Sequence, residues 1–146
     1  MLIGRDTQGD EREGFYLLSA DGRKEHPVLS LSSAFRRFGA FSADGEQILY
    51  SSTERNGRDF DIYIADVASG NSRLVYEGEF GFYPAAWQPG GKLVIVTETR
   101  GEDGNDVHLL DISNGDISPL FQPEVSAAFS DFYWLPDGSG FYLATS

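Results

Sequence analysis

The chain has 146 residues, of which 23 are acidic and 11 basic, giving a net charge of −12, and it contains no cysteine. Disulfides, thiolate metal sites and a cysteine nucleophile are therefore excluded. The negative charge repels phosphate groups, so nucleic acids and anionic membrane surfaces are unfavourable partners. Aromatic residues make up 14% of the chain, which argues against disorder because acidic disordered chains contain few aromatics.

The two ends of the chain read as strands that lack their neighbours. Met1–Gly4 leads directly into Arg5 and Asp6, without the basic and apolar regions of a secretory signal, so a cytoplasmic location is expected. Phe141–Ser146 is an apolar strand with no element after it. We therefore expect the chain to be part of a larger architecture.

A tight turn recurs at a constant interval along the chain. Ser42–Gly45, Gln88–Gly91 and Leu135–Gly138 begin 46 and 47 residues apart, and each follows an aromatic segment. Each turn also precedes a predicted apolar strand, and these strands are Gln47–Ser52, Lys92–Glu98 and Gly140–Thr145. The interval predicts a structural repeat.

A second motif repeats in phase with the first. Asp61–Asp66 matches Asp106–Asp111 and, more loosely, Gly14–Ser19, and a glycine-containing turn follows each copy. Asp-Gly and Asn-Gly pairs supply the positive φ that tight hairpins need. A further short strand then closes each unit, at His26–Leu29, Ser72–Glu77 and Asp116–Phe121.

Four short strands, a to d, thus repeat over about 46 residues, and no amphipathic helix interrupts them. This period is typical of a β-propeller blade, although an immunoglobulin-like sandwich is the alternative. The predicted fold is an all-β partial propeller of about three four-stranded antiparallel blades. Its predicted segments are 1–30 (strands b to d), 31–77, 78–121 and 122–146 (strands a and b). Such an arc is expected to be a fragment of a longer chain, an oligomer that completes the ring, or a loosely folded piece, because unfinished blades present bare strand edges.

These repeats resemble the propeller repeats of TolB-like proteins and of the prolyl oligopeptidase family of serine peptidases. That repeat has an aromatic strand, a Ser-Pro-Asp-Gly turn, an apolar strand, a loop rich in Arg, Asn, Gly and Asp, and an Asp-Ile-Tyr-like strand. The first full copy here is Phe38–Gly45, Ile48–Ser52, Arg55–Asp59 and Asp61–Asp66, and the second runs from Trp87 to Asp111. Leu2–Asp6, Gly9–Glu11 and Phe35–Gly39 resemble an early blade of the peptidases.

The resemblance implies that any hydrolytic chemistry lies in a separate α/β-hydrolase domain with a G-x-S-x-G nucleophile elbow. No such motif occurs in the 146 residues, so no catalytic residue is assigned and the chain is expected not to be an enzyme. Of its two histidines, His108 replaces an aromatic of the other repeats (Tyr16, Tyr63) and is expected to pack as one.

The loops between strands b and c hold most of the acidic residues, interleaved with arginines. Hard cations such as Ca²⁺ bind clustered carboxylates, so Glu102, Asp103 and Asp106 are weak calcium candidates, and no other cofactor is expected. The alternative is that these loops form internal ion pairs and capped turns, as the neighbouring Arg55, Arg58 and Arg100 suggest.

The connections between strand d and the next strand a should reach the ring axis, because strand a is innermost. Exposed aromatics beside arginine are good recognition anchors. The candidate partner-binding residues there are Phe35, Arg36, Arg37, Phe80, Phe82 and Tyr83. The alternative is that Phe80, Phe82 and Phe129 pack between blades.

The predicted function is a non-catalytic propeller segment, resembling the gating and substrate-selecting domain of a prolyl-oligopeptidase-like serine peptidase. Its expected partners are a protein or peptide, a hydrolase domain in the parent chain, or further copies that complete the ring. The alternatives are a TolB-like protein-binding propeller and a self-assembling structural module.

Overall fold

A computed structural model describes residues 1–145, which form thirteen β-strands and no helix. The all-β prediction is confirmed, and within these residues no helix is available to cross a membrane. The strands are β1 (Leu2–Arg5), β2 (Gly14–Leu18), β3 (Glu25–Leu29), β4 (Arg36–Phe41), β5 (Gln47–Ser52), β6 (Asp61–Asp66), β7 (Ser72–Tyr76), β8 (Phe82–Trp87), β9 (Leu93–Arg100), β10 (Gly104–Asp111), β11 (Asp116–Phe121), β12 (Phe129–Trp134) and β13 (Phe141–Thr145).

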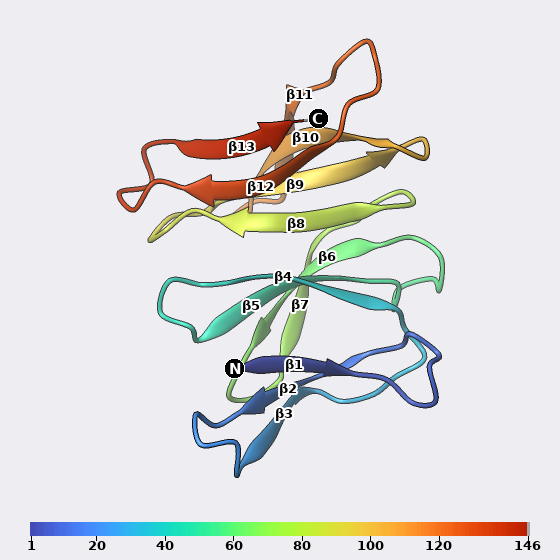
Figure 1. The fold of residues 1–146 in the computed structure, drawn as a ribbon, viewed down its shortest axis with the longest axis vertical. Coiled ribbons are helices and arrows are strands. Elements are labelled where there is room, and N and C mark those ends of the chain that lie inside the picture. Colours follow the sequence, from blue (N-terminus) through green and yellow to red (C-terminus); the bar gives the residue numbers. More distant parts are fainter. Residues whose placement is uncertain (146) are drawn as a thin grey trace.

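The strands pair in chain order into four antiparallel sheets. We call them sheet I (β1–β3), sheet II (β4–β7), sheet III (β8–β11) and sheet IV (β12–β13). Figure 1 shows them stacked face to face, with sheet I and sheet IV at opposite ends. The first strands of successive sheets lie against each other, β4 against β8 and β8 against β12. The stack is therefore open rather than closed into a ring.

The sequence repeat is also a repeat of backbone irregularities. In each of the first three sheets the pairing register shifts at the same repeat position, between Phe15 and Tyr16, between Ile62 and Tyr63, and between Val107 and His108. The unpaired residue lies each time on the last strand of the sheet, at Val28, Val75 or Leu120, so a β-bulge recurs with the repeat.

The core consists of three layers, one between each pair of neighbouring sheets. Successive side chains of a strand point to opposite faces. In β5, Ile48 and Tyr50 therefore face sheet I, while Leu49 faces sheet III, and all three are fully buried. Burial on both faces explains why this strand is apolar without the alternation of a surface strand.

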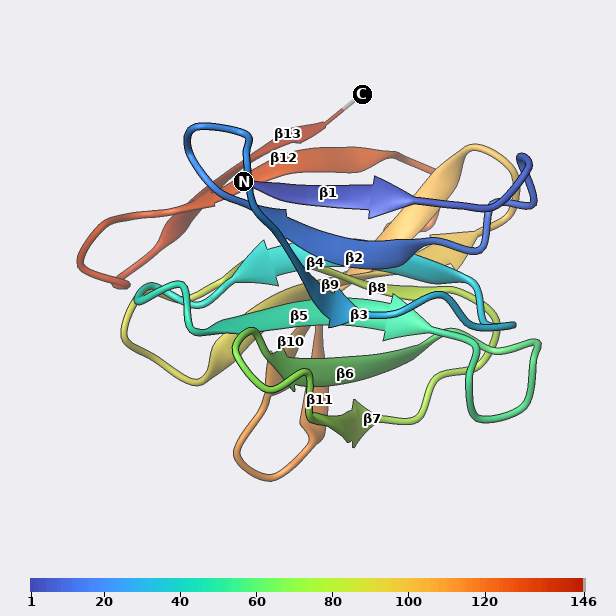
Figure 2. The ribbon, with the colours of Figure 1, turned by 90° about the horizontal axis from the view of Figure 1, so that it is seen from below.

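The antiparallel topology sorts the connections to two ends of the stack, as Figure 2 shows. Six connections lie at one end, here called the loop end: β1–β2, β3–β4, β5–β6, β7–β8, β9–β10 and β11–β12. The other six connections, which join β2–β3, β4–β5, β6–β7, β8–β9, β10–β11 and β12–β13, lie at the opposite end, here called the turn end. The predicted recognition residues fall at the loop end.

Candidate functional site at the loop end

Two arginine–aspartate pairs fasten the acidic loops. Arg55 donates to both carboxylate oxygens of the fully buried Asp61, at 2.8 and 3.0 Å, and Arg100 donates to Asp106 at 3.0 Å. The residues are six positions apart in both pairs. Each arginine also donates to a backbone carbonyl of the next connection, that of Gly78 or Pro123. The repeated pair therefore ties the b–c loop to the connection that leads into the next sheet.

Three residues from separate elements form an aromatic–arginine cluster. The guanidinium carbon of Arg37, at the start of β4, lies 4.6 Å from the ring centroid of Tyr83 and 5.7 Å from that of Phe60. The two rings contact each other with centroids 5.1 Å apart. Arg37 is exposed, and within residues 1–145 no carboxylate pairs with it. The rings thus hold a cation that stays available to an anionic group.

Phe80 projects beside this cluster from the β7–β8 connection. Its side chain is 74% exposed and its φ is 59°, a backbone conformation that side-chain-bearing residues rarely adopt. Two hydrogen bonds fix it there, from Phe80 N to Asp59 Oδ1 at 3.1 Å and from Phe60 N to Phe80 O at 2.7 Å. The backbone that carries this exposed phenyl ring is therefore fixed, and the Arg58 guanidinium carbon lies 5.9 Å from the ring centroid.

The anchor of this arrangement is Asp59, whose side chain is almost fully buried. Its carboxylate accepts hydrogen bonds from the Arg58 guanidinium at 2.9 and 3.0 Å, from Asn56 Nδ2 at 2.8 Å and from Phe80 N. These donors, above all Arg58, hold the pKa of Asp59 well below its usual value. Asp59 is consequently ionised whenever the protein is folded near neutral pH.

The structure corrects two of the six recognition candidates. Arg36 is only 9% exposed and donates to the carbonyls of Glu13 and Ser30, so it supports the loops from beneath. Phe82 is 6% exposed and packs between sheets, against Tyr76. Both side chains are buried, although Arg36 also lines the cavity beside Phe35 and Phe60. The alternative that Phe80, Phe82 and Phe129 pack between blades holds for Phe82 and Phe129 and is wrong for Phe80. Phe35 is half-buried, and the Arg12 guanidinium carbon lies 5.0 Å from its ring centroid.

Comparison with known proteins identifies the architecture. No family model matches the chain. A curated relative, dipeptidyl-peptidase 5 of Porphyromonas gingivalis, is 30% identical over 119 residues, covering 71% of this chain and 17% of that protein. TolB from Acinetobacter baumannii superimposes with a TM-score of 0.73 and 22% identity, over 96% of this chain and 34% of TolB. A prolyl endopeptidase structure matches with a TM-score of 0.56 and 14% identity, over 92% of this chain and 21% of that chain.

The chain is an arc of a β-propeller. It spans about a sixth of the curated relative and about a third of TolB, so it corresponds to part of each. The sheets are blades, and β4, β8 and β12 are the strands that approach the axis. Arg37 and Tyr83 belong to two of these inner strands, so the aromatic–arginine cluster joins neighbouring blades at the loop end.

A cavity of about 490 Å³ adjoins the cluster. Phe35 to Phe38 and Phe60 line it together with Glu11 and Glu13 from the β1–β2 loop. The site therefore combines apolar rings with charges of both signs. Sequence reasoning missed Phe60, because an aromatic directly before an Asp-Ile-Tyr motif reads as strand packing. The stacking of Arg12 on Phe35 and of Arg58 on Phe80 was also not predicted, although Arg58 forms the expected loop ion pair, with Asp59.

The calcium candidates lie on the β9–β10 hairpin of the third blade. Asp106 is paired with Arg100, and Glu102 and Asp103 are exposed in the turn. Within residues 1–145, no three or more His, Asp or Glu side chains gather closely enough to hold a metal ion. The Arg100–Asp106 pair agrees with the alternative expectation, that these loops form internal ion pairs.

His108 packs as the sequence predicted. It is 7% exposed, its ring lies 6.0 Å from that of Phe82, and its Nε2 lies 2.8 Å from Glu98 Oε2. It occupies the position beside the register shift that Tyr16 and Tyr63 hold in the preceding blades. This environment assigns His108 to the core between the second and third blades.

Proposed function

We propose that this arc is a non-catalytic recognition segment of a propeller that accompanies a hydrolase domain of the prolyl oligopeptidase type. The similarity to a dipeptidyl-peptidase and to a prolyl endopeptidase supports such a parent protein. In this proposal the loop end contacts peptide or protein, and the chain itself makes and breaks no bond.

The observation that carries the proposal is the aromatic–arginine cluster together with the exposed Phe80. Binding energy at protein interfaces concentrates on aromatic and arginine side chains that are held in place before binding. Here two rings hold Arg37, and two backbone hydrogen bonds hold Phe80 in a rare conformation. An anionic or aromatic group of a peptide would complete the contacts that these side chains leave open.

The test is selection from a random octapeptide library on the immobilised chain. We expect wild-type protein to enrich peptides that the variant Arg37→Ala/Phe80→Ala no longer enriches. Tyr133→Ala is the matched control, because it removes an exposed aromatic far from the loop-end cluster. Equal enrichment by all three proteins, or none by any, would contradict the proposal. Turnover of a dipeptidyl chromogenic substrate by the purified chain would contradict its non-catalytic part.

A second candidate is a TolB-like protein-binding propeller, which the higher TM-score to TolB favours. The two candidates differ in what surrounds the arc in its parent protein. Limited proteolysis of the full parent, followed by mass spectrometry, would release a hydrolase domain in the first case and none in the second.

A further inference from the structure

Sheet I has no inner strand within residues 1–145. Sheets II and III each begin with one, β4 or β8, and the remaining strands pair outward from it. Sheet I instead begins with β1, which corresponds to β5 and β9, because the register shift beside β2 matches those beside β6 and β10. The position at the free edge of β1, which an inner strand fills in the next two sheets, is therefore open in the part of the chain that the structure describes.

The free edge of β1 presents unpaired backbone groups. Met1 and Leu18 exchange two hydrogen bonds, from Met1 N to Leu18 O at 2.9 Å and from Leu18 N to Met1 O at 2.7 Å. Hydrogen-bonded and non-hydrogen-bonded pairs alternate along an antiparallel ladder. Along β1 from Met1, Leu2 and Gly4 fall in pairs of the second kind, so their N–H and C=O groups point away from β2. Such an edge is a template for a further strand.

The face of β4 that borders this open position lacks cover. Phe38 faces sheet I, where its ring centroid lies 6.4 Å from that of Phe15, and it is 43% exposed and lines the cavity of about 490 Å³. Pro84 holds the corresponding position of β8, directly before the register shift, and is buried. The cover of Pro84 is β4 itself, because a Cβ at Gly39 would lie only 2.6 Å from Pro84 Cγ. Phe38 is therefore exposed because no inner strand of sheet I stands against it.

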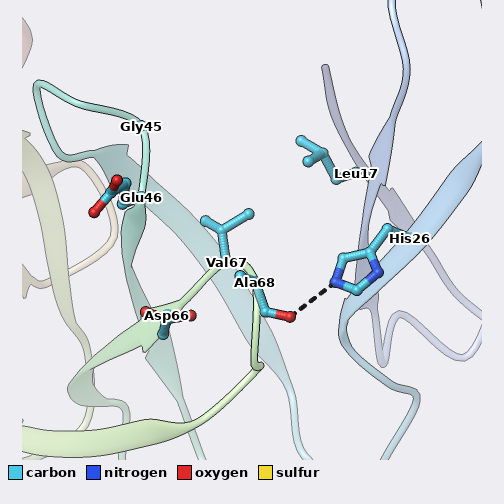
Figure 3. Close-up of a pocket in the computed structure, with 7 residues that line it drawn as sticks. All are labelled: Leu17, His26, Gly45, Glu46, Asp66, Val67 and Ala68. Carbon is cyan, nitrogen blue, oxygen red and sulfur yellow. Dashed lines mark hydrogen bonds between the residues drawn. The ribbon is translucent and has the colours of Figure 1, made fainter.

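The two sheets that border the open position are fixed to each other. Arg36 of β4 donates to the carbonyl oxygens of Glu13 and Ser30, at 3.3 and 2.6 Å. At the turn end, Nε2 of His26 in β3 lies 3.1 Å from the carbonyl oxygen of Ala68 in the β6–β7 connection, and Figure 3 shows this contact. Contacts between sheets I and II thus hold both borders in place, and the open position is preformed.

We propose that the free edge of β1 binds an extended segment of a separate polypeptide, which becomes the fourth strand of sheet I. Backbone hydrogen bonds to Leu2 and Gly4 supply affinity, and the side chains of the segment supply specificity. Gly39 covers Pro84, and Ala85 holds the place of Gly39 in β8, so the residue that covers Phe38 must be small. The net charge of −12 selects a neutral or basic segment over an acidic one. This edge is separate from the aromatic–arginine cluster, so the inference does not depend on the proposed function.

The experiment measures amide hydrogen exchange by NMR on the isotopically labelled full chain, with and without a capped octapeptide of the sequence of residues 35–42. This basic peptide has the pattern of an inner strand. At about ten times the Kd of the peptide, exchange of the Leu2 and Gly4 amides should slow by about tenfold, while the amides of Ile3 and Arg5, which already pair with β2, change little. Absence of this alternation, or protection confined to other residues, would overturn the proposal. Protection that appears without peptide and rises with protein concentration would also overturn it, because a second copy would then fill the edge.

The matched probe is the same peptide with Gly39→Val. Valine raises strand propensity and hydrophobicity, so non-specific association would become stronger. A branched side chain where glycine passes Phe38 should instead weaken binding about tenfold, because the close approach of the two inner strands leaves no room for it. Equal or tighter binding of the valine peptide would contradict the assigned position.

Two variants of the chain test the edge itself. Gly4→Pro removes an outward-pointing N–H, a change that edge strands tolerate, and we expect peptide binding to weaken about tenfold. Gly4→Ala is the matched control, because it places the same Cβ beside the Glu13 side chain and keeps the N–H, so it should bind as wild type does. Equal binding by wild type and both variants would contradict the proposal. Equal weakening in both variants would contradict it too, by assigning the contact to the Glu13 side chain.

Discussion

The inner blades, sheets II and III, bury a strand-b side chain that the terminal sheet IV leaves exposed, although all three derive from one repeat. Leu49, Ile95 and Tyr142 occupy the same position of strand b, one residue after the pairs Phe41–Ile48, Trp87–Val94 and Trp134–Phe141. Leu49 and Ile95 are fully buried, whereas Tyr142 is 68% exposed. The repeat thus specifies strand and register, while burial depends on whether a further sheet covers the face.

Sheet IV packs against a neighbouring blade on one face and is exposed on the other. Phe129, Phe132, Trp134 and Phe141 pack against the third blade, and Trp134 Nε1 donates to the Ala86 carbonyl. Tyr133 and Tyr142, paired across the hairpin on its opposite face, are 65% and 68% exposed. Blade packing therefore stabilises each sheet through two separate interfaces, which mutations can address one at a time.

The largest expected effect comes from deleting a buried side chain at the shared position. Leu49→Ala removes a side chain from the layer between the second and third blades and should lower the free energy of unfolding by about 2–5 kcal/mol. Tyr142→Ala should change it by about 1 kcal/mol or less, because surface substitutions have small effects. Urea denaturation of the two variants measures both values. Equal losses would show that sheet IV is covered in solution.

The buried ion pair of the second blade should matter more than its repeat in the third. Asp61 is fully buried and fastened at both oxygens, while Asp106 accepts one bond from an arginine that is 44% exposed. Asp61→Asn should cost about 2–3 kcal/mol, because Arg55 and Gly78 N lose a charged acceptor, and Asp106→Asn about 1 kcal/mol or less. Thermal unfolding of the two variants shows which substitution lowers the stability more. The reverse order would contradict the conclusion that Asp61 is the more strongly held of the two aspartates.

Acid should weaken the junction of the second and third blades through Asp59. Its pKa is lowered on folding, so its stabilising contribution is present above the ordinary value of 3.8 and disappears as the pH falls toward the folded pKa. The third blade has Gly104 where the second has Asp59, so this contribution has no counterpart there. The free energy of unfolding should therefore decrease less steeply with falling pH for Asp59→Asn than for wild type, as measured by denaturation at a series of pH values. Glu79→Gln, an exposed neighbour, is the control, and parallel curves for Asp59→Asn and wild type would contradict the assignment.

Sequence reasoning succeeded where the information is local. The strands Gln47–Ser52, Asp61–Asp66 and Asp116–Phe121 have the predicted bounds, because β-branched and aromatic runs between Gly and Asp turns specify a strand without reference to neighbours. The same reasoning could not distinguish Phe80 from Phe82, which are two residues apart and were assigned the same environment in each alternative. Their opposite exposure depends on the positive φ of Phe80 and on hydrogen bonds to Asp59 and Phe60, which lie about twenty residues away. Likewise, burial of Arg36 depends on carbonyls of the preceding blade.

The smallest effect on stability, and the sharpest test of the open ends, is expected from Tyr133→Ser/Tyr142→Ser. Both side chains are exposed, so the folded arc should lose about 1 kcal/mol or less. If the exposed face of sheet IV contacts another copy, light scattering across a dilution series should show a mass above one chain for wild type and a single chain for the double variant. The charge of −12 opposes self-association, so added salt should raise the wild-type mass. If wild type is oligomeric and the double variant keeps the same mass, the contact lies elsewhere, on the edge of sheet I or at the loop end.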